Sequence, residues 1–243
     1  VTLSSTGSAA TANVSSYAIV ASNVTNNGTF NTSNYNISYV NGSLAVTQAN
    51  ITVTANDQSR TYGGTNPTSG NVTLTTGSLY NGDTLSTASV ASAANATSNV
   101  GNYTLTASNQ TLSAGQISNY NVSYANGTLT VNPAPLGVSV NATYSGTTTL
   151  TQGTYTLTGL MNSETLSVAT STLNNANVAA NGANYVTAIT SGGGTANLSN
   201  YVLNAGYNGA SNSNHTNSAT LNAAALTITA NAANMTYNGT GYT

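Results

Sequence analysis

The chain has 243 residues, of which 39% are hydrophobic and only 2% are charged, and its formal net charge is −2. Soluble proteins average about 25% charged residues, so this chain has very few of the cations that attract nucleic acid or anionic lipid. It also has no apolar run of the ~18 residues that are needed to span a bilayer. We therefore expect no nucleic-acid partner and no membrane insertion, and the absence of cysteine excludes disulfides and thiolate metal sites.

The residue usage favours strands and turns over disorder. Val, Ile, Thr and Tyr recur along the chain, while the polar remainder is mostly Asn, Ser, Thr and Gly. The predicted fold class is mostly β, built from tandem small antiparallel or mixed β-sheet modules of β-sandwich or β-grasp-like type. We expect these modules to be arranged end to end as a rod or filament.

Residues 1–48 are predicted to be the rear part of a repeat module. The motif of residues 33–44 returns at residues 118–129, about 85 residues later. A repeat of this length argues against a continuous β-solenoid, whose rungs are about 20–30 residues long. Within the motif, Asn41-Gly42 predicts a β-hairpin, and Asn126-Gly127 repeats that signal.

We predict that two complete modules follow, residues 49–133 and residues 134–223. The front part of a further module, residues 224–243, comes after them. Each opens with an alternating strand and then a Tyr followed by small turn residues. The three strands are residues 51–55, 136–140 and 226–230, and the three turns are residues 62–64, 144–146 and 237–239. Since the first and last modules are incomplete, we expect a longer array.

Other elements are predicted within and between these modules. The Ala- and Ser-rich residues 87–97 are compatible with a short helix, and Pro133 and Pro135 mark a module junction where a missing N–H costs least. The aromatic rings of the repeated Asn-Tyr and Tyr-Gly positions are expected to fill the cores. These core candidates are Tyr35, Tyr62, Tyr103, Tyr120, Tyr144 and Tyr201.

No catalytic, cofactor-binding or metal-binding residue is predicted, and the chain is not expected to be an enzyme. His215 has no acidic neighbour in sequence and is interpreted as a loop residue. Asp83 and Glu164 occupy equivalent module positions, too far apart for paired carboxylates, and are interpreted as backbone caps of their turns. Arg60, the sole cation, is expected to pair with Asp57, and three acids cannot supply the oxygen ligands of a calcium site.

The order of the motifs resembles a known family. Their order is similar to that in the MBG/YDG-type repeats of large bacterial surface exoproteins, such as filamentous-haemagglutinin-like adhesins. The motifs that carry this resemblance are residues 51–55, Tyr62-Gly63-Gly64, residues 77–86, residues 101–105 and residues 118–131. The resemblance implies an extracellular location on the bacterial cell surface and a stalk of small mostly-β domains. It does not identify a ligand.

The predicted function is therefore a structural repeat region that forms an extracellular stalk or filament in adhesion or in biofilm or matrix formation. Copies of the chain are the expected partners, through end-to-end or lateral association, together with host or matrix glycans or proteins. An alternative is a glycan- or ice-binding surface built from Thr- and Asn-rich β faces, such as the pairs Thr52 and Thr54 or Thr128 and Thr130. Glycosylation at Asn-x-Ser/Thr triplets is a further hypothesis.

Overall fold

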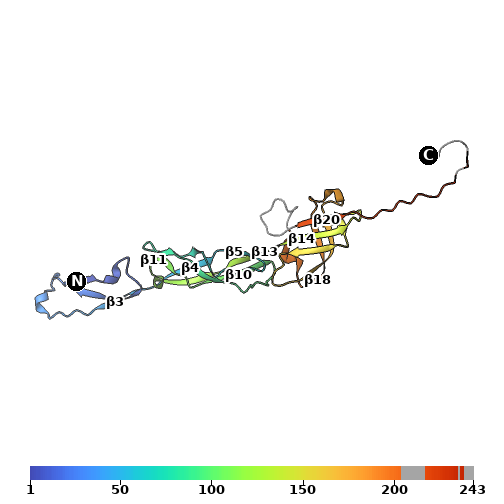
Figure 1. Cartoon of the computed structure of the whole chain (residues 1–243). Helices are drawn as coiled ribbons and strands as arrows, with labels where there is room; N and C mark the ends of the chain where they lie inside the picture. Colours follow the sequence, from blue (N-terminus) through green and yellow to red (C-terminus); the bar gives the residue numbers. More distant parts are fainter. Residues whose placement is uncertain (204–216, 235, 238–243) are drawn as a thin grey trace. The chain divides into compact units, whose positions relative to one another are not determined.

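The computed structural model describes residues 1–203, 217–234 and 236–237, so His215 and the last two residues of the turn predicted at 237–239 lie outside it. The chain divides into two compact units, Val1–Pro133 and Ala134–Thr243. The described residues form β-strands and short 3₁₀ turns and contain no α-helix (Figure 1). The predicted mostly-β class is confirmed, and the module boundaries proposed above stay a prediction.

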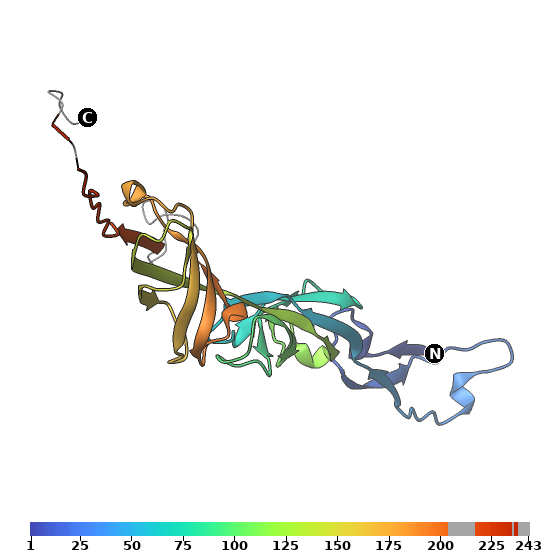
Figure 2. The same cartoon turned by 90° about the vertical axis from the view of Figure 1, so that its right-hand side faces the viewer.

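The first 48 residues form a three-stranded antiparallel sheet in the order β1 (Thr2–Ser4), β2 (Ser15–Ser22) and β3 (Gly42–Val46). The hairpin predicted around Asn41-Gly42 is wrong, because residues 36–41 form no strand and β3 pairs with β2 in the register Ile19 to Gly42. Figure 2 shows the light-blue segment between the 3₁₀ turn η2 (Thr32–Asn34) and β3 as a loop.

The remainder of the first unit is organised around β4 (Ala49–Ala55). This strand lies between β12 (Tyr120–Ala125), which runs parallel to it, and β7 (Val72–Thr76), which runs antiparallel. A second sheet has the order β5-β13-β10-β9-β6, and β8 pairs with β11. The bounds of these strands are β5 (Gln58–Thr61), β6 (Ser69–Gly70), β8 (Thr84–Leu85), β9 (Ala88–Ala91), β10 (Gly101–Ser108), β11 (Leu112–Ala114) and β13 (Gly127–Asn132).

Alternation of apolar and polar residues builds two cores in this unit. Ile51 and Val53 of β4 cluster with Tyr120, and Leu105 and Leu129 cluster with small residues that include Ala88 and Val90. The helix predicted over residues 87–97 is wrong, since Ala88 and Val90 alternate with exposed neighbours in β9 and bury one face of that strand. A period of two places apolar groups on one face of a strand and not of a helix.

Asn126-Gly127 also forms no hairpin, although strands flank it as predicted. β12 pairs with β4, and β13 pairs with β5 and β10, so the chain passes from one sheet to the next at this dipeptide. A Cβ added to Gly127 would lie 2.1 Å from the carbonyl oxygen of Ala55. Glycine is required here by a close backbone approach and not by a tight turn.

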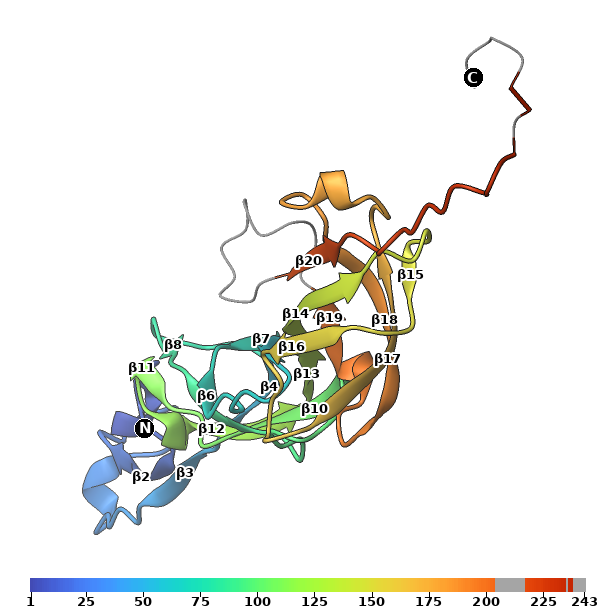
Figure 3. The ribbon, with the colours of Figure 1, turned by 45° about the vertical axis from the view of Figure 1, so that its right-hand side comes forward.

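The second unit is organised around β14 (Ala134–Thr143), whose neighbours β16 (Thr154–Thr158), β19 (Tyr201–Leu203) and β20 (Asn217–Asn222) are labelled in Figure 3. A separate sheet has the order β15 (Thr149–Leu150), β17 (Leu166–Leu173) and β18 (Val186–Gly194). Pro135 is the second residue of β14 and lies opposite Val202. Residues 223–234 form no strand.

The two units use one parallel pairing in the same register. In the first unit Ala49 lies opposite Tyr120, and in the second unit Ala134 lies opposite Tyr201. The repeated tyrosine that follows the first strand of each pair also has an equivalent backbone contact. The Tyr62 N–H donates to the Asn132 carbonyl, and the Tyr144 N–H donates to the Asn222 carbonyl, both at 2.8 Å. The repeated sequence motifs therefore correspond to a repeated strand pairing.

Candidate functional site

A buried hydroxyl joins β12 to the turn before β8 in the first unit. The Tyr120 hydroxyl accepts a hydrogen bond from the Tyr80 N–H at 2.9 Å and donates one to Asp83 Oδ2 at 2.7 Å. The turn itself is closed by the Asp83 N–H, which donates to the Tyr80 carbonyl. We call this arrangement the acid–tyrosine contact, and its hydroxyl uses both its donor and its acceptor capacity.

The second unit contains the same contact. The Tyr201 hydroxyl accepts a hydrogen bond from the Met161 N–H at 3.0 Å and donates to Glu164 Oε2, while the Glu164 N–H donates to the Met161 carbonyl. The equivalence of Asp83 and Glu164 predicted from the sequence is thus a structural equivalence. The predicted backbone cap is wrong for Asp83, because its carboxylate accepts from a tyrosine side chain.

The environment of the Tyr120 hydroxyl favours its neutral form. Burial raises the pKa of Tyr120, and the hydrogen bond to Asp83 and the negative charge of that residue raise it further, against the opposing effect of the Tyr80 N–H. A neutral hydroxyl is needed to donate to the carboxylate. The contact is therefore intact at neutral pH.

Three of the predicted core tyrosines are buried, namely Tyr62, Tyr120 and Tyr201, and Tyr103 is half-buried against the core that contains Leu105. Tyr35 and Tyr144 are 61% and 40% exposed, so their prediction as core residues is wrong. Tyr35 stacks on Phe30 instead, with ring centroids 5.1 Å apart. The residues that would enclose it, a β4-like strand and an acid-bearing turn, are absent from its sheet.

Arg60 is buried and bound by neutral groups. Its Nε donates to Asn66 Oδ1 at 2.7 Å and its two terminal nitrogens donate to the carbonyls of Thr61 and Asn95. Asp57 instead accepts the Thr128 N–H at 2.7 Å. The predicted Arg60–Asp57 ion pair is therefore wrong, because each group is satisfied by a different segment. A guanidinium has five donors and can hold several carbonyls at once.

An asparagine joins the first 48 residues to the following strands within the first unit. Asn119 Oδ1 accepts the Val14 N–H at 3.0 Å, and Asn119 Nδ2 donates to Asn13 Oδ1 at the same distance. Asn81 adds a hydrogen bond from its side chain to the Ala10 carbonyl. These contacts use amides in place of charges.

The threonine pairs of the alternative hypothesis lie on two sheets. Thr52 and Thr54 belong to β4, whereas Thr128 and Thr130 belong to β13. The Thr54 hydroxyl lies 3.0 Å from that of Thr75, and Thr130 donates to Asn102. These hydroxyls form hydrogen bonds across strands of their own sheets.

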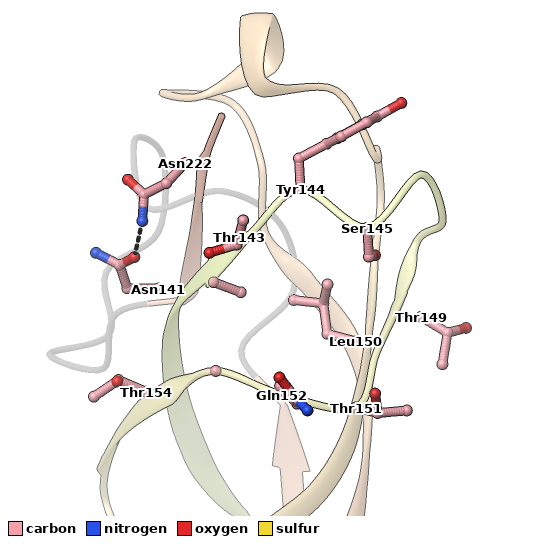
Figure 4. A pocket seen from close by; sticks show the side chains of 12 residues that line it. Asn141, Thr143, Tyr144, Ser145, Thr149, Leu150, Thr151, Gln152, Thr154 and Asn222 are labelled. Atoms are coloured by element: carbon pink, nitrogen blue, oxygen red, sulfur yellow. Dashed lines mark hydrogen bonds between the residues drawn. The ribbon is translucent and has the colours of Figure 1, made fainter. Parts of the chain in front are cut away.

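The second unit contains a polar hollow of about 670 Å³ (Figure 4). Its walls come from the end of β14, from β15 and the loop after it, and from β20, and Tyr144 is half exposed at its edge. The Asn222 side chain donates to Asn141 Oδ1 at 2.6 Å beside it. The lining side chains are mostly amides and hydroxyls: Asn141, Thr143, Tyr144, Ser145, Thr149, Thr151, Gln152, Thr154 and Asn222.

Sequence reasoning missed several buried amide side chains, among them that of Asn217. Asn217 Oδ1 accepts the Val186 N–H at 3.0 Å and its Nδ2 donates to the Val186 carbonyl at 2.8 Å, so the side chain pairs with β18 as a backbone amide would. Among so many asparagines nothing in the sequence singles it out.

Among the residues that the structure describes, no group of three His, Cys, Asp or Glu side chains is placed to share a metal ion. None of the helical segments described is long and apolar enough to span a membrane.

Part of the chain matches a known family. The family model of the MBG domain (YGX type) matches residues 51–130, a segment that contains Tyr62-Gly63-Gly64, Asp83 and Tyr120. No curated protein and no solved structure matches the chain significantly.

Proposed function

We propose that this chain is a structural repeat region of a secreted bacterial surface protein, because residues 51–130 match the MBG domain of the YGX type, which occurs in surface proteins. It forms an extracellular stalk or filament and serves in adhesion or in a biofilm matrix. The observation that carries this proposal is the parallel pairing of an early with a late strand in each unit.

The direction of this pairing determines how a repeat resists stretching. β4 begins the segment 49–133 and is parallel to β12, which lies near the end of that segment. A pull on the two chain ends moves parallel neighbours in opposite directions along their length. All hydrogen bonds of the ladder are then loaded together, whereas a hairpin would lose them one at a time. β14 and β19 have the same relationship in the second unit.

The acid–tyrosine contact reinforces this pairing. Tyr120 is the first residue of β12 and Tyr201 is the first residue of β19, and each hydroxyl is bound to a turn elsewhere in its unit. Side chain and ladder must therefore break together. Such a repeat is suited to carry tension between a cell and a surface.

Single-molecule stretching of the whole chain between two handles tests the proposal. We expect two separate unfolding events, one for each unit, and a lower force for the first unit in the Tyr120→Phe variant. Tyr35→Phe is the matched control, since Tyr35 has no acid partner. Extension of the chain without a resolved force peak would contradict a load-bearing role, and antibody labelling of intact source cells tests the surface location.

A second candidate function is glycan binding by the polar hollow of the second unit. Amides and hydroxyls beside an aromatic ring are suited to the hydroxyls and apolar faces of sugars. A glycan array with the wild type and with the Gln152→Ala variant tests this function. Binding that is absent in the wild type, or unchanged in the variant, would remove the hollow as the site.

A further inference from the structure

Two asparagine side chains of the first unit bind one short segment, residues 10–14. Asn119 accepts the Val14 N–H and also donates to Asn13 Oδ1, both at 3.0 Å. Asn81 donates to a carbonyl of the same segment at 3.1 Å. We call these three hydrogen bonds the amide junction, because every donor and every acceptor in it is an amide group.

The amide junction is not held by a packed core. A hollow of about 220 Å³ lies beside it, lined by Val14 and Val46 from the first 48 residues and by Asn119 and Tyr120 from the strands that follow. A hydrogen bond between neutral groups contributes little on its own, because water competes for the same atoms. The junction therefore depends on holding both asparagines in the right places at once.

The acid–tyrosine contact connects the two chain segments that carry these asparagines. Asn81 lies inside the turn that the Tyr120 hydroxyl binds through the Tyr80 N–H at 2.9 Å and Asp83 Oδ2 at 2.7 Å. Asn119 is the residue directly before Tyr120. The hydroxyl is thus a direct bridge between the turn and the start of β12, and it presents both amides together to the segment that they bind.

We propose that the turn 80–83 and residues 118–120 form a docking surface for residues 10–14 of the preceding repeat, and that the acid–tyrosine contact holds this surface in its binding shape. A surface that already has its bound shape loses less conformational freedom on binding. Since coupling between two equilibria is reciprocal, docking of the segment in turn stabilises the acid–tyrosine contact. The proposal rests on the stalk function proposed above and explains how consecutive repeats keep a fixed orientation.

The docking surface belongs to the repeated pattern. In the second unit Asn162 occupies the place of Asn81, and Asn200 occupies that of Asn119. Asn81 and Asn162 also share the left-handed backbone conformation, with φ of 55° and 53°. The acids of the two turns differ, but the asparagines do not. The same two amide side chains therefore stand beside both acid–tyrosine contacts.

The docked segment recurs as well. The Tyr17 hydroxyl donates to the Asn13 carbonyl at 2.8 Å, and the Tyr103 hydroxyl donates to the Asn99 carbonyl at 2.7 Å, four residues earlier in each case. Valine follows both asparagines. A tyrosine thus fixes the backbone of the segment in both places. In the first place this leaves the asparagine side chain and the next N–H to bind Asn119.

Hydrogen exchange of the Val14 amide in the whole chain tests the proposal, since this N–H is bound by Asn119. Asn119→Ala is expected to speed its exchange by about 5-fold or more. Tyr120→Phe is expected to do the same, although the lost hydroxyl binds the turn and not the segment. Tyr124→Phe is the matched control, because its hydroxyl lies on the same strand and accepts the Gln110 N–H instead.

The amides of β10 distinguish loss of docking from general loss of stability. Exchange at Val14 that is unchanged in Asn119→Ala overturns the docking contact. In Tyr120→Phe, an acceleration at Val14 that is no larger than the acceleration in β10 overturns the coupling to the acid–tyrosine contact.

Asn81→Gly is a second variant that keeps the acid–tyrosine pair, because glycine readily adopts the left-handed conformation of this position. It removes the amide that binds the segment and is expected to speed exchange at Val14. Asn109→Gly is the matched control, since Asn109 has a φ of 52° and lies outside the junction. Equal exchange in the two glycine variants overturns the role assigned to the turn.

Spin labels report the orientation itself, since the chain has no cysteine of its own. Labels attached through Ala45→Cys in β3 and Thr104→Cys in β10, both exposed positions, are expected to give a narrow distance distribution. Asn119→Ala and Tyr120→Phe are expected to broaden it. A broad distribution in the otherwise wild-type chain, or one that is equally narrow in all variants, overturns the proposal. These experiments apply no force, so their failure leaves the load-bearing proposal standing.

Discussion

The hydroxyl of Tyr120 donates a hydrogen bond to the carboxylate of Asp83, which lies 37 residues earlier in the chain. The bond connects the start of a late strand to a turn in the middle of the repeat. The second unit contains the same connection between Tyr201 and Glu164, over the same separation in sequence. The side chain of Glu164 is one methylene longer than that of Asp83, and the acid–tyrosine contact is nevertheless kept.

Removal of this hydroxyl is expected to destabilise the first unit. In Tyr120→Phe the Tyr80 N–H and the Asp83 carboxylate both lose a buried partner, at a cost of about 1–3 kcal/mol in the free energy of unfolding. Urea denaturation measures the change. Tyr35→Phe is the matched control and is expected to have almost no effect, since Tyr35 is 61% exposed. Equal effects of both substitutions would contradict a special role for the contact.

The same hydroxyl predicts the response of stability to alkaline pH. The pKa of Tyr120 is raised in the folded state above its ordinary value of 10.0, chiefly by burial. The folded state therefore favours the neutral hydroxyl, and this contribution is fully present below pH 10 and is lost as pH rises through the folded pKa. Denaturation from pH 7 to 11.5 should show the difference between wild type and Tyr120→Phe shrink above pH 10. A difference that grows with pH would contradict the assigned direction.

Much of the repeat could be predicted from the sequence, because repeated strands need repeated alternation. Ile51 and Val53 are buried as the period of two indicates, and the equivalence of Asp83 with Glu164 is structural. These features depend on local pattern and on similarity between repeats, and both are visible in one sequence.

The pairing of strands could not be predicted in the same way. Asn126-Gly127 has the sequence of a hairpin, but its glycine serves a close approach to Ala55, 72 residues away. Tyr35 has the same sequence neighbours as Tyr120 and is exposed because no strand lies beside its segment. Whether a residue is buried thus depends on distant segments, which local pattern does not reveal.

Substitution of Gly127 is expected to damage the first unit. In Gly127→Ala the new methyl group would lie 2.1 Å from the Ala55 carbonyl oxygen, so that backbone must move, at a cost of about 1–3 kcal/mol or more. Thermal unfolding measures this loss of stability. Gly42→Ala is the control, because a Cβ on Gly42 would make only an ordinary van der Waals contact with Ile19. A melting temperature of Gly127→Ala equal to that of the wild type would contradict the close approach.

Arg60 provides a test of how a buried cation is stabilised without an anion. Arg60→Met removes the donors to Asn66, Thr61 and Asn95 and leaves the acceptors of three partly buried hydrogen bonds without this partner. We expect a loss of about 2–4 kcal/mol in the free energy of unfolding, measured by urea denaturation.

A double-mutant cycle separates this account from an ion pair with Asp57. Asp57 binds the Thr128 N–H, a bond that the amide oxygen of Asp57→Asn can also accept. The two substitutions should therefore add within about 0.5 kcal/mol, because the side chains share no partner. If Arg60 were paired with Asp57, the double variant would instead lose distinctly less than the sum of the single losses. Additivity would show that carbonyl and amide oxygens alone hold the only cation of the chain.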